Sequence, residues 1–302
     1  MKETGRQVWV VGEALIDLVS SREDVQIPMV GGGPCNSAKA LARLGHQTYF
    51  IGGISSDEYG RAIEEELESS GVDLSLSYRG QLPTALAIAR INESGLASYD
   101  FELEETTSFA FDTSWLPKQD PYVIHLGSVA TLLEPGASQL LSWVGDKSAV
   151  VVFDPNVRPS IEKNQEIYRA SVERWIDLAK IVKLSQDDLS WLYQDSESDV
   201  IASWLDRGVE LVVVTRAEQG LSAFNNEGRI DCPAAKVELV DSIGAGDTIG
   251  AVIVEGVLNF GLAELKGDNL RQVLKRAAKA AGITCSRAGA NPAWKEELDL
   301  AL

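Results

Sequence analysis

Six short, continuously apolar segments recur along this chain and constrain its fold more than any other feature. They are VWVV (8–11), TYFIG (48–52), YVIHL (122–126), AVVVF (149–153), IVKL (181–184) and LVVVT (211–215). Unbroken apolar character in such short runs is typical of strands buried on both faces, as in a parallel sheet covered by helices. Segments with helical spacing lie between them, at 58–70 after the predicted cap Asp57, and at 137–144, 166–179 and 270–281. The alternation predicts a doubly wound α/β fold with a mostly parallel central sheet.

Two segments, 13–30 and 84–103, break this alternation. Both have the character of strands, and the second carries a polar turn, NESG, at 92–95 that predicts a hairpin. Strands inserted in this way are placed to form a small sheet over one edge of the large one. No proline- and serine-rich linker, low-complexity tract or internal repeat divides the 302 residues. We therefore expect one domain over 1–302 with the small sheet as an appendage.

The charge balance limits what the surface can bind. The chain has 45 acidic and 27 basic residues, a net charge of −18, which repels nucleic acid and anionic membranes over most of the surface. A phosphate site must therefore be local, made of backbone N–H groups and a few basic side chains. The sequence shows no charged-then-apolar leader and no run of about 18 apolar residues, so we expect a cytoplasmic protein without a membrane span.

Cysteine and histidine are too few and too dispersed to predict a disulfide framework or a metal site. Cys35, Cys232 and Cys285 are widely spaced and form no CxxC motif. With His46 and His125 as the only histidines, a multi-histidine metal site is excluded and a Ser-His-Asp triad has little support. We interpret His125 as a hydrogen-bonded histidine at a strand end rather than as a catalytic residue.

The first of two glycine clusters is GGGPCNSAKALARLG, at 31–45. Its three glycines allow a ligand to approach the backbone closely. Asn36 is placed to start the following helix, and its side chain could cap that helix. A plain turn with a cap explains this stretch nearly as well as a ligand site does.

The second cluster is DSIGAGDTIGAVIVEG, at 241–256. Gly244, Ala245 and Gly246 precede an apolar helical stretch, so their N–H groups can converge on a phosphate at a helix N-terminus. Asp247 would lie beside that anion, placed to accept a proton from a hydroxyl that attacks the phosphorus. An ordinary helix cap is the alternative for Asp247, and the flanking small residues favour the chemical role.

Other nucleotide-binding motifs are missing. No GxxxxGK followed by serine or threonine occurs, and protein-kinase signatures are absent. The first predicted strand leads into VVGEALIDLV, which has Gly12 alone instead of GxGxxG. A dinucleotide-dependent oxidoreductase therefore has weak support.

Together, GGGPCN and DSIGAGDT resemble the two signature regions of the PfkB/ribokinase family of carbohydrate kinases, and the resemblance covers essentially the whole chain. Further matches point to the fructokinase-like branch: GEALIDLV (12–19), DEYGRAI (57–63), PTALAIARI (83–91), IHLGSVA (124–130), DPNVR (154–158) and VKLS (182–185). The resemblance implies a ribokinase-like fold in which 13–30 and 84–103 form a lid that closes over the sugar. Closure would keep water from replacing the sugar as acceptor.

The resemblance also implies roles for the matching residues. Asp247 would be the general base, and the amides of Gly244, Ala245 and Gly246 would form an anion hole. Arg158 matches an arginine that reaches the phosphate or substrate region. The residues implied in sugar binding are Asp17, Gly32, Gly33 and Asn36. Those implied in nucleotide binding are Ser185, Thr215, Gly220 and Gly246. Asp188 and Asp241 are implied in metal binding.

The implied reaction is transfer of the γ-phosphate of ATP to a sugar hydroxyl, with Mg²⁺ and a monovalent cation such as K⁺ beside Asp241. A homodimer formed through the lid is implied as well. A ribokinase, a nucleoside or aminoimidazole riboside kinase, a 2-keto-3-deoxygluconate kinase and a catalytically silent relative are the alternatives. The chain departs from the family pattern at Ala217, where glycine is usual, at Asp188, where glutamate is usual, and at Glu104, where many relatives have arginine.

Overall fold

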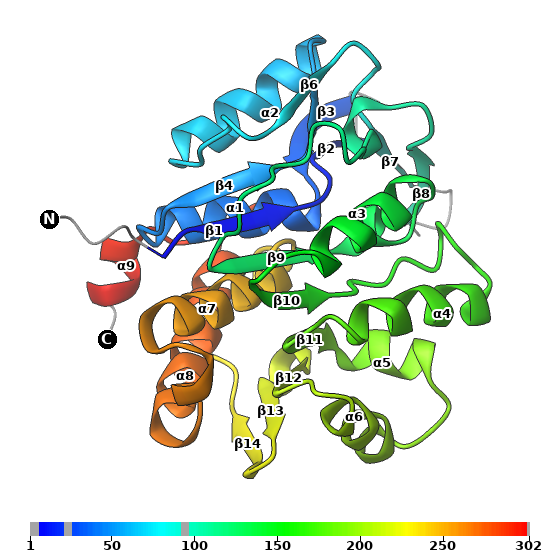
Figure 1. Ribbon diagram of the computed structural model, residues 1–302. Helices are drawn as coiled ribbons and strands as arrows, with labels where there is room; N and C mark the ends of the chain where they lie inside the picture. Colours follow the sequence, from blue (N-terminus) through cyan, green and yellow to red (C-terminus); the bar gives the residue numbers. More distant parts are fainter. Residues whose placement is uncertain (1–5, 21–25, 92–96, 301–302) are drawn as a thin grey trace, which may run out of the picture.

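The computed structural model describes residues 6–20, 26–91 and 97–300, and an eight-stranded sheet runs through its centre (Figure 1). All six apolar segments form strands of this sheet: β1 Val8–Val11, β4 Thr48–Ile51, β9 Val123–Gly127, β10 Val150–Asp154, β11 Ile181–Ser185 and β12 Leu211–Thr215. The strand order is β14-β13-β12-β11-β10-β9-β1-β4. Only the hairpin of β13 (Leu221–Asn225) and β14 (Gly228–Cys232) pairs antiparallel in it. The predicted mostly parallel sheet is confirmed.

Helices cover both faces of the sheet because successive residues of each strand point to opposite sides. Val8 and Val10 belong to one core and Trp9 and Val11 to the other. The first core includes residues of α1 Gly33–Arg43, α2 Glu58–Ser69, α7 Ala245–Phe260 and α8 Gly267–Cys285. The second includes residues of α3 Gly136–Gly145, α4 Gln165–Ile176, α5 Gln186–Leu192 and α6 Glu197–Asp206. This arrangement confirms the doubly wound fold.

The helix starts test two capping predictions. Asp57 caps α2, since its side chain accepts a 2.7 Å hydrogen bond from the Gly60 N–H. The prediction that Asn36 starts and caps α1 is wrong. Gly32, with φ of +101°, occupies the N-cap, and α1 begins at Gly33 with a proline in its first turn. Asn36 therefore lies one turn inside the helix, where its side chain is free to reach another element.

A second sheet of four strands, in the order β3-β2-β7-β8, comprises β2 Leu15–Ser20, β3 Gln26–Gly31, β7 Leu86–Ile91 and β8 Ala97–Glu102. The small sheet expected from 13–30 and 84–103 is thus present, and the predicted turn at 92–95 lies outside the described residues. β2 begins shortly after β1 ends, so the small sheet lies at the carboxyl end of the large one. Leu15, Ala85, Ala87 and Leu103 pack on Val129, which follows β9. Besides four short 3-10 helices, the remaining elements of the described residues are a pair of short strands, β5 Gly53–Ser55 and β6 Tyr78–Gly80, and α9 Lys295–Leu300.

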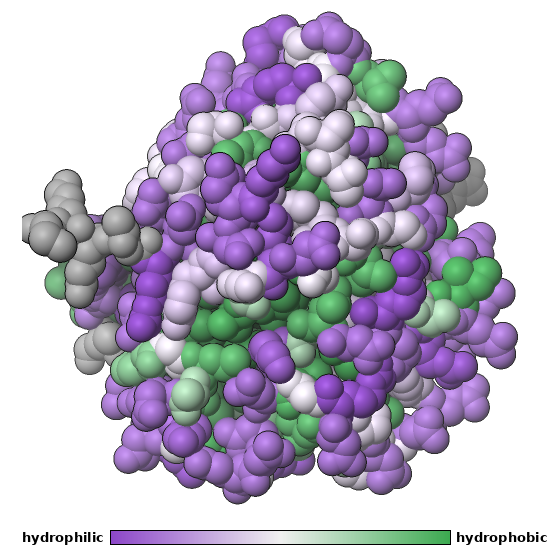
Figure 2. Space-filling view, in the orientation of Figure 1, coloured by the Kyte–Doolittle hydropathy of each residue, from purple (hydrophilic) through white to green (hydrophobic). Residues whose placement is uncertain are grey.

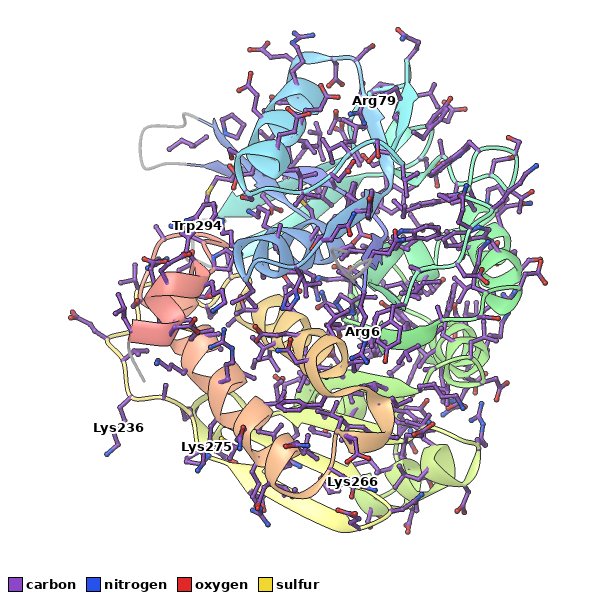
Figure 3. All side chains as sticks on the ribbon, turned by 60° about the vertical axis from the view of Figure 1, so that its left-hand side comes forward. Arg6, Arg79, Lys236, Lys266, Lys275 and Trp294 are labelled. Atoms are coloured by element: carbon purple, nitrogen blue, oxygen red, sulfur yellow. The ribbon has the colours of Figure 1, made fainter. Side chains whose placement is uncertain are left out.

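The surface is mainly hydrophilic on the face shown in Figure 2. No helix of the described residues is long and apolar enough to cross a membrane. The connection 233–244, between β14 and α7, is largely exposed, and Lys236 on it points away from the molecule (Figure 3). The three cysteines are free.

Candidate active site

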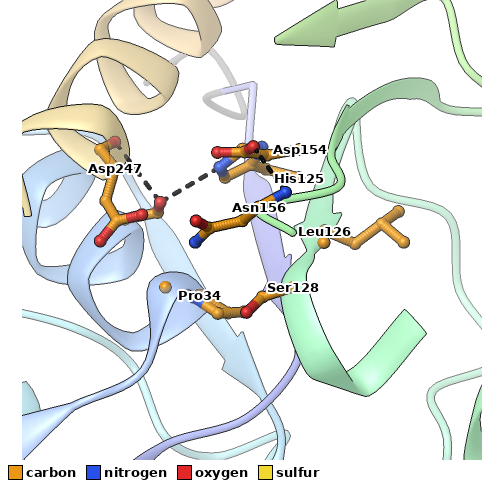
Figure 4. A pocket seen from close by; sticks show the side chains of 10 residues that line it. Pro34, His125, Leu126, Ser128, Asp154, Asn156 and Asp247 are labelled. Carbon is orange, nitrogen blue, oxygen red and sulfur yellow. Dashed lines mark hydrogen bonds between the residues drawn. The ribbon is translucent and has the colours of Figure 1, made fainter. Parts of the chain in front are cut away.

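The carboxyl ends of β9 and β10 meet the first turns of α1 and α7 at a pocket shown in Figure 4. In open α/β sheets, ligands bind at this end of the strands. We call it the Asp247 pocket. Its lining residues are Gly33, Pro34, Ser37, His125, Leu126, Gly127, Ser128, Asp154, Asn156 and Asp247. The two glycine clusters of the sequence therefore contribute to one site.

Asp247 is buried in the first turn of α7, with 8% of its surface exposed. The Asn36 side chain donates a 2.9 Å hydrogen bond from Nδ2 to Asp247 Oδ2. Burial raises the pKa of Asp247, while the Lys183 ammonium and the Asn36 hydrogen bond oppose that rise. Gly244 occupies the N-cap of α7, so the alternative that Asp247 is an ordinary cap is wrong. Its carboxylate lines the pocket instead.

The turn that opens α7 combines an unusual backbone conformation with unpaired amides. Gly244 has φ of +78°, a conformation that favours glycine. At Gly246 a Cβ would lie 3.0 Å from Lys183 Nζ, so a side chain there would crowd the ammonium. The Ala245 amide donates to Ser242 O at 3.3 Å. In the described part of the chain, this leaves the amides of Gly244 and Gly246 for an anion.

Gly32 and Gly33 bring the backbone of α1 close to the carboxylate. A Cβ at Gly32 would lie 2.7 Å from Glu13 O. At Gly33 it would lie 2.7 Å from Asn156 Nδ2 and 3.4 Å from Asp247 Oδ1. Any side chain at Gly33 would therefore occupy the space that the two polar groups share.

Asn36 and Asp17 both present oxygen atoms suited to hydroxyl groups. Asn36 Oδ1 is buried and has no hydrogen-bond partner among the described residues. Leaving such an atom without a partner costs about 1–3 kcal/mol, which a ligand hydroxyl would recover. Asp17, on β2, lies against Gly31, where a Cβ would be 2.1 Å from Asp17 Oδ2. Burial raises the pKa of Asp17 to about 6, and Arg158 opposes the rise.

Arg158 contributes positive charge to this group of acids. Its Nη1 donates to Asn156 Oδ1 at 2.8 Å and to the carbonyls of Asn156 and Val157. Its charge lowers the pKa of both Asp247 and Asp17. The guanidinium is thus held by its own loop while it acts electrostatically on both carboxylates.

Asp188 forms a capping box with Ser185 at the start of α5. The Ser185 hydroxyl accepts from the Asp188 N–H at 3.0 Å, and Asp188 Oδ2 accepts from the Ser185 N–H at 2.9 Å. Asp188 Oδ1 accepts from the Val157 N–H at 3.0 Å. The carboxylate therefore joins α5 to the segment that carries Asn156 and Arg158.

Asp241 is also fixed by backbone amides, since Oδ1 accepts from Ile243 N–H at 3.0 Å and Oδ2 from Gly289 N–H at 2.9 Å. Within the described residues, no group of three or more histidine, cysteine, aspartate or glutamate side chains is arranged as a metal site. Mg²⁺ in phosphoryl-transfer sites needs only one or two carboxylates, beside phosphate oxygens and water. The metal-binding roles of Asp188 and Asp241 stay predictions.

Thr215 and Gly220 lie outside the Asp247 pocket, on the turn that joins β12 to β13. Gly220 has φ of +96°, and a Cβ there would lie 2.1 Å from Cys232 O. Ala217, on the same turn, has φ of +48°. A left-handed conformation costs a non-glycine residue about 1–2 kcal/mol, which accounts for the glycine of the family pattern at this position.

Sequence reasoning missed three buried charged groups, Asp154, Lys183 and Glu13. Asp154 lines the pocket and pairs with the buried Lys183 at 2.7 Å. Glu13 is buried and accepts from the Ala130 N–H at 3.0 Å. Glu13, Asp154 and Lys183 stand in the motifs GEALIDLV, DPNVR and VKLS. These motifs lie toward the carboxyl ends of predicted parallel strands, and that position could have identified the three residues as candidates for the site.

His125 lies in the middle of β9 and not at a strand end as expected. The prediction that it is hydrogen-bonded is confirmed, since Nδ1 is 3.2 Å from Val152 O and Nε2 is 3.2 Å from Ser37 Oγ. Burial lowers its pKa to about 4, so the ring is neutral at physiological pH. Ser37 also lies 3.4 Å from the backbone oxygen of Asp247, which connects β9, α1 and α7 (Figure 4).

Comparisons with known proteins identify the family of this chain. A family model described as pfkB family carbohydrate kinase matches residues 6–297. The chain is 33% identical over 290 residues to a fructokinase of Rhizobium leguminosarum bv. trifolii, covering 93% of this chain and 86% of the relative. It is 26% identical over 302 residues to a fructokinase of Escherichia coli, covering 97% and 98%.

Solved structures extend the comparison to three dimensions. A fructokinase with bound ATP from Xylella fastidiosa matches with a TM-score of 0.90 and 25% identity, covering 98% of both chains. An aminoimidazole riboside kinase from Salmonella enterica shares the fold, with a TM-score of 0.84 and 23% identity over 97% of this chain and 98% of that one. The chain belongs to the pfkB family of carbohydrate kinases and is a sugar phosphotransferase.

Proposed function

We propose that this chain transfers the γ-phosphoryl group of ATP to a hydroxyl of a ketohexose, with fructose as the first substrate to test. The observation that carries the proposal is a buried carboxylate, Asp247, at the N-terminus of α7, held by Asn36 beside two unpaired backbone amides. The names of the fructokinase relatives support the substrate class.

The geometry suggests which oxygen receives the proton. Asp247 Oδ2 already accepts from Asn36, whereas Oδ1 lies toward Gly33. In the proposed step the sugar oxygen forms a bond to the γ-phosphorus as the bond from that phosphorus to its bridging oxygen breaks. ADP departs with the bonding electrons, and the hydroxyl proton passes to Asp247 Oδ1. The amides of Gly244 and Gly246 and the Arg158 guanidinium would stabilise negative charge on the phosphoryl oxygens.

The remaining predicted residues would surround this centre. Mg²⁺ would neutralise phosphate charge when bound, with Asp188 acting through metal-bound water, and a monovalent cation would lie beside Asp241. Thr215, Gly220 and Ser185 would bind the nucleotide. Asp17, Gly32 and Asn36 would bind the sugar under the small sheet acting as a lid. The single-domain organisation, a homodimer through that lid and a cytoplasmic location stay predictions.

The test is ADP release from ATP and Mg²⁺ with a panel of acceptors, using Asp247→Asn as the matched blank. We expect turnover with fructose that the variant loses. Turnover confined to ribose, an aminoimidazole riboside, another nucleoside or 2-keto-3-deoxygluconate would replace fructose as the substrate. Binding of sugar or ATP without turnover on any acceptor would identify a silent relative and contradict the proposal.

A further inference from the structure

A buried ion pair that the proposed reaction does not use lies directly below the Asp247 pocket. Lys183 points inward from β11 with 4% of its surface exposed. Its Nζ donates a 2.7 Å hydrogen bond to Oδ2 of Asp154, the last residue of β10. Asp154 itself lines the pocket beside Asp247 and Asn156 (Figure 4). The pair therefore adjoins the site at which the phosphoryl group would be transferred.

Helix α7 is shaped to admit the lysine. Gly246 and Gly250 are one helical turn apart and lie on the same face. A Cβ at Gly246 would be 3.0 Å from Lys183 Nζ, and one at Gly250 would be 4.0 Å from Lys183 Cδ. The lysine stem thus runs along a strip of α7 without side chains, and its ammonium lies under the turn that provides the anion-binding amides.

The ammonium serves more than one carboxylate. Burial alone lowers the pKa of a lysine, yet the pKa of Lys183 is raised because Asp154, Asp247 and Asp188 together outweigh the effect of burial. Among the described residues Nζ has one hydrogen-bond partner, Asp154. Two of its three N–H groups therefore remain for other acceptors.

Asp247 has neighbours on every element that packs around it. Asn36 on α1 hydrogen-bonds to it, and Arg158 and Lys183 favour its charged form. Asp154 on β10 opposes that form. His125 on β9 is neutral. Of the groups that favour the charged form of Asp247, Lys183 has the largest effect.

We propose that Lys183 is a positioning residue for phosphoryl transfer: its ammonium, fixed in place by Asp154, stabilises the carboxylate of Asp247 inside the buried pocket. The inference rests on the proposed kinase activity, in which that carboxylate accepts the proton. Without the lysine, Asp247 would share a buried site with Asp154, and its pKa would rise further.

The experiment compares Lys183→Met, Lys183→Arg and the double variant Lys183→Met/Asp154→Asn with the wild type. For Lys183→Met we expect kcat to fall by about 100-fold, as for loss of one electrostatic contact to a transition state. The acidic limb of its pH profile should move to higher pH, because the pKa of Asp247 rises. Lys183→Arg keeps the charge and should recover part of the rate.

The double variant separates the proposed role from a structural one. It removes both charges, so no unpaired ion is left and thermal stability should return toward that of the wild type. We expect its activity to stay well below that of the wild type, because Lys183 affects Asp247 more strongly than Asp154 does. Recovery of kcat to within about threefold of the wild type would show that Lys183 serves only to neutralise Asp154 and would overturn the inference.

A matched control lies further along the same helix. Glu255 on α7 and Arg276 on α8 form a largely buried ion pair, with a 2.6 Å contact. Arg276→Met/Glu255→Gln should leave kcat and its pH profile unchanged. If this control lost as much kcat as the Lys183 double variant, both losses would be explained by disturbed helix packing, and the inference would be refuted.

One readout does not depend on turnover. The carboxyl ¹³C shift of Asp247, assigned with Asp247→Asn, reports its pKa directly. That pKa should be higher in Lys183→Met than in the wild type, and an unchanged value would refute the inference even in an active enzyme. A wild type without turnover on any sugar would refute the proposed function instead.

Discussion

Replacing Asp247 with asparagine should separate activity from stability. Asparagine keeps the size of the side chain and can still accept the hydrogen bond that Asn36 donates at 2.9 Å. It cannot accept a proton from the sugar. Loss of a general base costs typically about 10²–10⁴-fold, so kcat should fall within that range. The KM for the sugar should change little, because Asp17, Gly32 and Asn36 are untouched.

The same substitution should stabilise the fold at neutral and alkaline pH. Burial raises the pKa of Asp247, so above that pKa the folded protein carries a desolvated charge that the unfolded chain does not. The stability that protonated Asp247 provides is present below its unfolded pKa and is lost as pH rises through the folded pKa. Asparagine does not ionise, so the variant does not lose this stability as pH rises. We expect a gain of about 1–3 kcal/mol at pH 8, the usual scale of a desolvation cost.

Urea unfolding at pH 8 and at pH 4, together with initial rates of ADP release, would measure both effects. The stability gain should be smaller at pH 4 than at pH 8, because lower pH favours the protonated, uncharged form of Asp247 in the wild type. A variant with a rate within about tenfold of the wild type would refute the assignment of the base. A variant less stable than the wild type at pH 8 would refute the argument from burial.

Three further predictions follow from the pocket. Glu13, whose pKa burial raises from 4.5 to about 7, contributes stability below pH 4.5 that is lost as pH rises through about 7. Glutamine does not titrate, so Glu13→Gln should remove about 3 kcal/mol of the change in unfolding free energy between these two pH values. Urea titrations across this pH range would measure the difference. Gly33→Ala would place a methyl group 2.7 Å from Asn156 Nδ2, so kcat/KM should fall by at least about tenfold in the ADP-release assay while far-ultraviolet circular dichroism is unchanged. Removing divalent metal with EDTA should abolish turnover, and added Mg²⁺ should restore it.

The large sheet could be predicted from the sequence because each of its buried parallel strands leaves a local signature. Segments such as VWVV and LVVVT became β1 and β12 with the predicted bounds. The hairpin of β13 and β14 was missed, since Gly228–Cys232 is largely exposed and has no continuous apolar run. Local apolar character therefore predicted the parallel strands, the edge strand β4 included, but not the antiparallel hairpin.

The site was predictable only where a motif carries its own geometry. A glycine turn before a helix predicts backbone amides without intrahelical partners, and Asp247 lies in the first turn of α7, next to that turn. The role of Asn36 depended on a contact with a residue 211 positions away, and capping preference, which acts locally, gave the wrong answer. The pairing of Lys183 with Asp154 is likewise a contact between neighbouring strands. Residue spacing along the chain does not predict a contact of this kind.

The charges around the pocket explain why the reaction should need a divalent cation. Lys183 and Arg158 bring two positive charges, while Asp154, Asp188 and Asp247 bring three carboxylates. Lys183 is paired with Asp154 and also stabilises the Asp247 carboxylate, so little of its charge is left for the phosphates. ATP adds several negative charges to a chain whose net charge is −18. Amide dipoles at a helix N-terminus offset only about half an elementary charge. Positive charge brought with the nucleotide would balance its phosphates, and a divalent cation bound at this site would supply that charge.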